Sequence, residues 1–184
     1  MTVFAFGNRK PKIHSTAWIH PVADVTGKVF IGPSVYIGAG AIIRGDLGTI
    51  YIDTGSAILE NVTIQASPNQ KVFIGKNVTL SVAVVLHNCT IQDGAMIGMG
   101  AIISDNVEVG KGAIVGEGSV VKSNMKIESN MIAVGVPAKV IGKISEKKRV
   151  FIKTIPEVYQ SLTQKYPKKL RILNPEEYRW EEEK

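Results

Sequence analysis

The amino-acid sequence predicts an all-β fold, a three-sided parallel β-helix of about six to seven coils, followed by a C-terminal α-helical extension. Three features of the sequence carry this prediction. Between Ile13 and Ile127 aliphatic residues recur at steps of six, with three exceptions. Glycine often follows them directly, and a small or branched residue often stands four positions after them. A period of six fits neither an amphipathic helix nor an alternating strand, and a repeat this long is typical of a solenoid.

Each six-residue repeat is expected to form one short strand and one corner of a triangular coil. The aliphatic residue fills the axial core, and glycine at the corner allows a turn that a Cβ atom would hinder. Three repeats close one coil, and successive coils stack about 4.8 Å apart, the spacing between paired strands. The aliphatic positions are Ile13, Ile19, Val25, Ile31, Ile37, Ile43, Ile52, Ile58, Ile64, Ile74, Leu80, Leu86, Ile91, Ile97, Ile103, Val109, Val115, Val121 and Ile127.

The repeat stops near Ile141, where the composition changes. We expect the β-helix to cover residues 1–142 and a helical extension packed on it to cover residues 143–184, with the last residues loosely attached. Ser145 is the expected N-cap of the first helix.

Two prolines are expected to limit the helical extension. Pro156 should interrupt the first helix, and the second helical piece should end near Pro167. The apolar residues Val150, Phe151 and Ile155 are expected to lie along the wall of the prism.

The bulk composition favours a single soluble cytoplasmic domain without nucleic-acid or membrane partners. The chain has 184 residues, a formal charge of +6 and one cysteine, and it shows neither a long apolar span nor a secretory signal. Half of the 22 basic residues fall in the last 44 positions, where seven of the 16 acidic residues also fall. This pattern indicates a solvated helix face rather than a nucleic-acid surface.

The six-residue period is interrupted at three places. The steps that begin at Ile43, Ile64 and Leu86 are nine, ten and five residues long. With three repeats in each coil, these positions lie above one another, beside the same corner of the prism. Irregularities that gather on one face of a repeat protein usually mark its working face, so we expect a site at this corner.

A polar column is expected at this corner, formed by the residues that follow the aliphatic positions. Its middle members are Arg44, Gln65 and His87, spaced by about one coil each, and Asp46 lies two residues after Arg44. His87 stands in the apolar stretch LSVAVVLHNCTI and could be a buried core residue, but its place in the column favours a site. A flat-sided prism most simply forms a closed ring of three, which would put the column in a subunit cleft. The full column is Thr26, Arg44, Gln65, His87, Ser104 and Lys122.

Several segments together resemble the γ-class carbonic anhydrase family of hexapeptide-repeat proteins. They are PKIHSTAWIHPVADVTGKVFIG, AIIRGDLGTIYI, VFIGKNVTL, VLHNCTI, GAMIGMGAII and AVGVPAKVIGKIS, within residues 11–145. The resemblance implies a left-handed β-helix, a homotrimer and a C-terminal helix along the prism. In family enzymes, three histidines bind Zn, Fe or Co between subunits and activate a water molecule for attack on CO₂.

The resemblance implies a metal site that is incomplete in this chain. Arg44 and Asp46 match an intersubunit ion pair of the family, and His87 matches the third metal ligand. Gln65 and Val82 stand at the first two ligand positions, with Val82 contributed by the neighbouring subunit. Two of the three histidines are therefore absent from the expected site.

The remaining donors are too weak for a catalytic metal. Zinc needs three or four strong donors, whereas an amide is a weak donor and valine is none. Cys89 is expected to pack in the core, and His14 and His20 are expected to be single surface residues. Leu59, at a family glutamine position, and Val82 would make the cleft more apolar. We therefore expect no cofactor, unless an atypical site holds Zn, Fe or Co.

Three functions remain open from the sequence. The first is a degenerate family member without CO₂ hydratase activity, which binds a small ligand or a protein partner at the subunit cleft. The second is a metal-dependent carbonic anhydrase with an unusual site. The third is a coenzyme A-dependent acyltransferase that uses His87 as a general base. The candidate site residues are the same in each case: His87, Gln65, Arg44 and Asp46.

Overall fold

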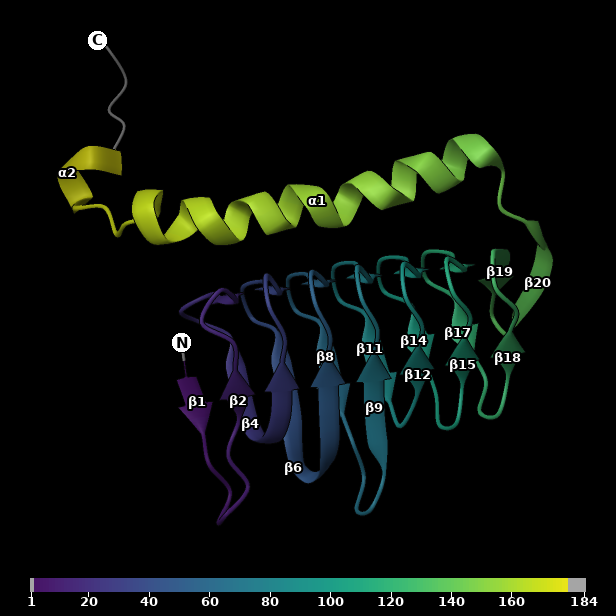
Figure 1. The fold of residues 1–184 in the computed structure, drawn as a ribbon, viewed down its shortest axis with the longest axis horizontal. Helices are drawn as coiled ribbons and strands as arrows, with labels where there is room; N and C mark the ends of the chain where they lie inside the picture. Colours follow the sequence, from purple (N-terminus) through teal and green to yellow (C-terminus); the bar gives the residue numbers. More distant parts are fainter. Residues whose placement is uncertain (1, 179–184) are drawn as a thin grey trace, which may run out of the picture.

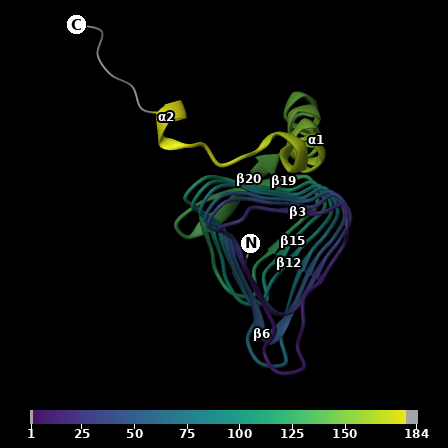
Figure 2. The same cartoon turned by 90° about the vertical axis from the view of Figure 1, so that its left-hand side faces the viewer.

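The repeat forms a left-handed parallel β-helix of about seven coils, which confirms the predicted fold class. A computed structural model describes residues 2–178 of the chain. Figure 1 shows the coils side by side along the prism, with a long helix running over their full length. Figure 2 shows the triangular cross-section, with that helix lying over one of the three sides.

The three sides of the prism are three columns of short parallel strands. The first contains β2 (Lys12–Ile13), the second halves of β4 (Asp24–Ile31) and β6 (Ile42–Ile52), β9 (Lys71–Ile74), β12 (Thr90–Ile91), β15 (Glu108–Val109) and β18 (Lys126–Ile127). The second contains β3 (Trp18–Ile19), β5 (Tyr36–Ile37), β7 (Ala57–Ile58), β10 (Thr79–Leu80), β13 (Met96–Ile97), β16 (Ile114–Val115) and β19 (Met131–Gly135), and β20 (Ala138–Lys143) joins it antiparallel. The third contains β1 (Thr2–Phe4), the first halves of β4 and β6, β8 (Thr63–Gln65), β11 (Val85–His87), β14 (Ile102–Ile103) and β17 (Val120–Val121).

The aliphatic residue of each repeat stacks on its counterpart in the next coil. Ile43 pairs with Ile64, and Leu86 pairs with both Ile64 and Ile103. These side chains are fully buried or nearly so, and they form one continuous core along the axis. Burial of such a column is the dominant favourable contribution to folding.

The corners are made by glycine and, more often than the sequence prediction anticipated, by asparagine. A Cβ atom on Gly98 would lie 2.6 Å from the backbone nitrogen of Glu117, so only glycine fits between these coils. Asparagine tolerates the left-handed backbone conformation better than most residues. It occupies that conformation at Asn61, Asn69, Asn77, Asn88, Asn106, Asn124 and Asn130.

A single helix, α1 (Glu146–Lys169), covers the second side of the prism, and a short helix, α2 (Pro175–Tyr178), follows it. Ser145 is the N-cap, as predicted, and its hydroxyl accepts a hydrogen bond from the backbone nitrogen of Lys148. The predicted break at Pro156 is wrong, because α1 continues through Pro156 and Pro167. Pro156 is buried on the face of α1 that also carries Ile152, and this packing offsets the backbone hydrogen bond that proline cannot donate.

The face of α1 that meets the prism also differs from the prediction. Val150 and Phe151 are 56% and 60% exposed, whereas Ile155 is half-buried and Ile152, which was not predicted, is buried. The expectation of a loosely attached C-terminus falls partly on residues 179–184, which lie outside the described residues. No helix in the described part of the chain is both long and apolar enough to cross a membrane.

An aromatic cluster joins the end of α1 to the first coils. The ring of Trp18 lies 5.2 Å from that of Tyr36 and 4.6 Å from that of Tyr166, and Tyr36 also contacts Tyr159. Burial raises the pKa of Tyr36, which therefore keeps its proton and donates to Glu60 at 3.3 Å. Side chains that are more than a hundred residues apart in the sequence thus pack together at the N-terminal end of the second side of the prism.

Two neighbouring residues of β14 test the axial core. Ile103 is fully buried, whereas Ile102 is 41% exposed on the outer surface of the same strand. Ile103→Ala should lower the free energy of unfolding by about 2–5 kcal/mol, because it leaves a cavity in the column. Ile102→Ala is the matched control and should cost about 1 kcal/mol or less. Urea denaturation at a fixed protein concentration measures both, and equal losses would contradict the proposed role of the column.

Candidate functional site

The three irregular repeats meet at one corner of the prism, as predicted. The excursions of β6 and of the segment after β8 project there, on the side away from α1 (Figure 2). Arg44 pairs in register with Gln65, and Gln65 pairs with His87. The middle members of the predicted polar column are therefore in register on the third side.

Arg44 and Asp46 form an ion pair within one chain. Arg44 Nη2 donates to Asp46 Oδ2 at 2.8 Å. This hydrogen bond lowers the pKa of the Asp46 carboxyl group and raises that of the guanidinium. Both partners lie on the same β6 strand, and the pairing between subunits that the resemblance implies stays a prediction.

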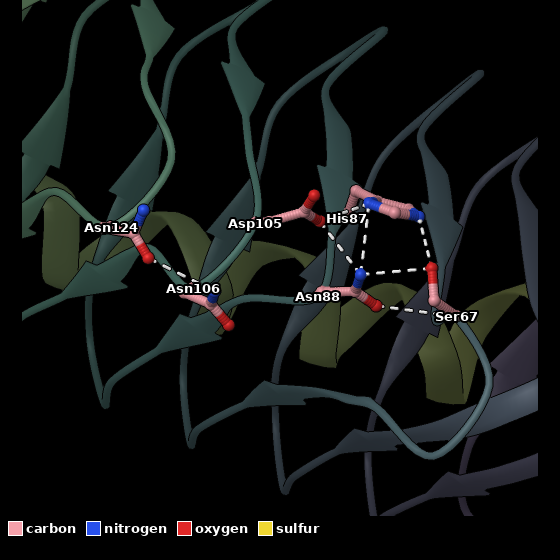
Figure 3. A network of polar contacts seen from close by, with 6 residues as sticks. All are labelled: Ser67, His87, Asn88, Asp105, Asn106 and Asn124. Atoms are coloured by element: carbon pink, nitrogen blue, oxygen red, sulfur yellow. Dashed lines mark hydrogen bonds and ion pairs between the residues drawn. The ribbon is translucent and has the colours of Figure 1, made fainter.

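His87 lies in a network of polar side chains from successive coils (Figure 3). Its Nδ1 atom contacts Asp105 Oδ1, and its Nε2 atom lies 3.1 Å from Ser67 Oγ. Because an ionised carboxylate only accepts hydrogen bonds, we assign the imidazole proton to Nδ1. Nε2 then carries the lone pair and accepts the proton of the Ser67 hydroxyl. The His87 side chain remains 36% exposed, so the network is open to solvent.

The shortened repeat after Leu86 is what brings Asp105 to His87. Leu86 pairs with Ile103, seventeen positions later. Four residues further on, Thr90 pairs with Glu108, eighteen positions later. The register therefore shifts by one residue between Leu86 and Thr90, in the segment that carries His87, and Asp105 of the next coil contacts the imidazole there.

Asn88 and a tight turn position Ser67. The backbone nitrogen of Gln70 donates to the carbonyl of Ser67 at 3.0 Å, and Asn69 has a positive φ, which closes a turn over residues 67–70. Asn88 Oδ1 accepts from the backbone nitrogen of Ser67 at 2.8 Å. Asn88 Nδ2 donates its two protons to Ser67 Oγ at 3.1 Å and to Asp105 Oδ1 at 2.9 Å, and it also lies 3.3 Å from His87 Nδ1. One amide therefore holds both ends of the network.

Sequence reasoning identified His87 but missed Ser67, Asn88 and Asp105. Counting repeats places Ser104 beside His87. The short step after Leu86 is visible in the sequence, but it does not show which side chain of the next coil contacts the imidazole. A signal was nevertheless present, because polar residues recur eighteen positions apart at Asn88, Asn106 and Asn124. Asn106 Nδ2 and Asn124 Oδ1 lie 3.2 Å apart, which extends this polar row along the corner.

The structure does not bring Val82 to His87 within one chain. Val82 packs against the buried cluster of Tyr36, Ala57 and Leu59. Leu59 is buried in that cluster. Among the residues that the structure describes, no group of three or more His, Cys, Asp or Glu side chains could hold a metal ion.

The other residues that were weighed as ligands lie apart from the network. His14 is exposed and His20 is half-buried, and each bonds within its own turn. Cys89 is buried in the axial core, as predicted. Burial raises the pKa of the Cys89 thiol to about 12, so it stays protonated at neutral pH.

Comparison with known proteins found relatives across most of the chain. The profile of the bacterial transferase hexapeptide (six repeats) matches residues 88–123. The carnitine operon protein CaiE of Escherichia coli O157:H7 is 30% identical over 162 residues, which cover 88% of this chain and 83% of CaiE.

Two solved structures share the fold. One is a Bacillus cereus protein named provisionally as an acetyltransferase, 35% identical with a TM-score of 0.87, covering 90% of this chain and 96% of its own. The other is a hexapeptide transferase family protein from Anaplasma phagocytophilum, 28% identical with a TM-score of 0.86, covering 90% and 98%.

The inert state of Cys89 can be tested by thiol titration. The native protein should not react with a disulfide reagent such as DTNB at mildly alkaline pH, because its single thiol is buried and protonated. After denaturation, the same sample should react with one equivalent of DTNB per chain, because unfolding exposes Cys89. Rapid reaction of the folded protein would contradict the packing of Cys89 in the core.

Proposed function

Because the chain belongs to the γ-carbonic anhydrase-like family of hexapeptide-repeat proteins that includes CaiE, we propose that it transfers acyl groups from a coenzyme A thioester, with His87 as the general base. The observation that carries the proposal is the contact of His87 Nδ1 with Asp105. Asp105 fixes the tautomer and the orientation of the ring, and Nε2 is left to accept a proton. Asp105 is thus a positioning residue in this mechanism.

The chemistry requires one base beside an electrophilic carbonyl. An amine or hydroxyl acceptor attacks the thioester carbon, and His87 Nε2 takes the proton of the attacking group. The carbon–sulfur bond then breaks, and coenzyme A leaves as the thiol with the proton that His87 returns. Arg44, which is half exposed two strands away in the column, could hold an anionic group of the donor.

The relatives support transfer in preference to the binding-only alternative. The Bacillus cereus protein named provisionally as an acetyltransferase is 35% identical over nearly its whole length. The contact of Asp105 with His87 Nδ1 also holds the imidazole in the tautomer that a general base needs. We therefore place the acyltransferase ahead of a ligand-binding or partner-binding protein.

The donor set also supports an activity without a resident metal. A carboxylate behind a histidine also occurs at zinc sites, so the pair by itself does not decide between the two chemistries. A catalytic zinc needs two further strong donors, and Gln65 and Val82 stand at the positions that the family fills with histidine. We therefore propose that the metal site is degenerate and that the protein does not hydrate CO₂.

A homotrimer is part of the same proposal. An apolar row runs beside the polar column on the outer surface of the third side, and its members Ile42, Val85 and Ile102 are about 40% exposed. A neighbouring subunit that covered this row would also enclose the solvent-exposed side of the His87 network. The acyl donor would then bind between two chains.

Replacement of His87 tests the proposed base. His87→Ala should lower kcat for transfer from acetyl-CoA by about 10²–10⁴-fold, the usual contribution of a general base. His14→Ala is the matched control and should leave the rate unchanged, because His14 is exposed in a turn of another corner. Asp105→Asn should change the pH profile of the rate while the fold is retained. Full activity of His87→Ala would overturn the proposal.

Removal of metal distinguishes the proposal from carbonic anhydrase activity. Elemental analysis of the purified protein should find well under one Zn, Fe or Co per chain, since the donors are too few. Treatment with a chelator should leave acyl transfer unchanged. A stoichiometric metal together with chelator-sensitive CO₂ hydration would refute the degenerate site.

A further inference from the structure

We infer that Ser67 is a nucleophile and that the acyl group passes through an ester on its Oγ atom before it reaches the acceptor. The inference deepens the proposed acyl transfer and rests on it. It assigns a covalent step to Ser67, which does not stand at any of the three metal-ligand positions of the family. The evidence is the arrangement of Ser67, His87 and Asp105 (Figure 3).

These three side chains form a continuous hydrogen-bonded chain. Ser67 Oγ lies 3.1 Å from His87 Nε2, and His87 Nδ1 contacts Asp105. The three residues come from successive coils, so their order across the corner is set by the stacking of the prism. A hydroxyl, an imidazole and a carboxylate in this order activate serine for attack on acyl groups on several unrelated folds.

Ser67 is held in place from two directions. The turn over residues 67–70 fixes its backbone, and the side chain of Asn88 bonds to its backbone nitrogen and to its hydroxyl. Because Asn88 donates to Ser67 Oγ, the hydroxyl proton is directed to His87 Nε2. Ser67 is half-buried, and the network keeps one open side for a substrate.

The position of Ser67 also argues against direct transfer. In the free protein the Ser67 hydroxyl is hydrogen-bonded to His87 Nε2, the atom that an external acceptor would need as its base. Direct transfer would first require an acceptor to displace Ser67, which the turn and Asn88 oppose. Attack by Ser67 itself requires no rearrangement of these residues.

The reaction balances in two half-reactions. In the first, Ser67 Oγ forms a bond to the thioester carbon, its proton moves to His87 Nε2, the carbon–sulfur bond breaks and coenzyme A leaves as the thiol with that proton. In the second, an amine, hydroxyl or water attacks the seryl ester and gives its proton to His87. The ester bond then breaks, and Ser67 recovers its proton. No oxidant, reductant or metal takes part.

A serine-directed probe tests the nucleophile independently of coenzyme A. A fluorophosphonate should label the wild-type protein once, and peptide mass spectrometry should place the label on Ser67. Ser67→Ala and His87→Ala should abolish labelling. Ser15→Ala is the matched control, since Ser15 is exposed in a distant turn, and it should label normally. Labelling at another serine, or no labelling, would overturn the inference.

Acetyl-CoA without an acceptor tests the covalent step. The intact mass of the wild-type protein should rise by one acetyl group, and Ser67→Ala should show no increase and a kcat lower by about a hundredfold or more. Ser67→Cys, which keeps a nucleophile, should form a thioester that neutral hydroxylamine cleaves. This variant separates loss of the nucleophile from loss of folding.

The outcomes distinguish the inference from the proposed function. If Ser67→Ala keeps the wild-type rate while His87→Ala loses it, transfer is direct and the inference fails, but the proposed function stands. If the fluorophosphonate labels Ser67 but acetyl-CoA neither acylates the protein nor supports turnover, the nucleophile stands and the proposed donor is wrong.

Discussion

The packing of aliphatic side chains along the prism axis is the constraint on which the rest of the structure depends. Each coil offers three such side chains, and each buries them only by lying in register on the coils before and after it. A shift of one residue would turn a buried side chain outward. The strands therefore keep one register from coil to coil. Variation in length is confined to the corners, where it disturbs few contacts of the axial core.

The candidate site follows from this division between fixed strands and variable corners. The residue missing after Leu86 leaves the core intact but shifts the corner, so that Asp105 reaches His87. The extra residues after Gln65 form the turn that presents Ser67. Insertions and a deletion thus assemble a polar network without a change of fold, as loops do on more familiar scaffolds.

The sequence predicted the features that depend on the six-residue period and missed those that depend on the conformation of the corners. The axial core and the register of Arg44, Gln65 and His87 both follow from counting repeats. Ser67 and Asp105 do not, because their positions depend on turn conformations and a register shift that six-residue counting averages out. The break expected at Pro156 failed for a related reason: packing against the prism outweighed a local rule about helices.

The course of α1 has a consequence for how the protein is made. The helix returns along the prism toward its beginning, so that Tyr166 covers Trp18 and Tyr36. On the ribosome, the first coils emerge long before the tail that covers them. The aromatic side chains of these coils remain accessible to chaperones and proteases until translation is nearly complete. A prematurely terminated chain that lacks α1 keeps this apolar patch exposed.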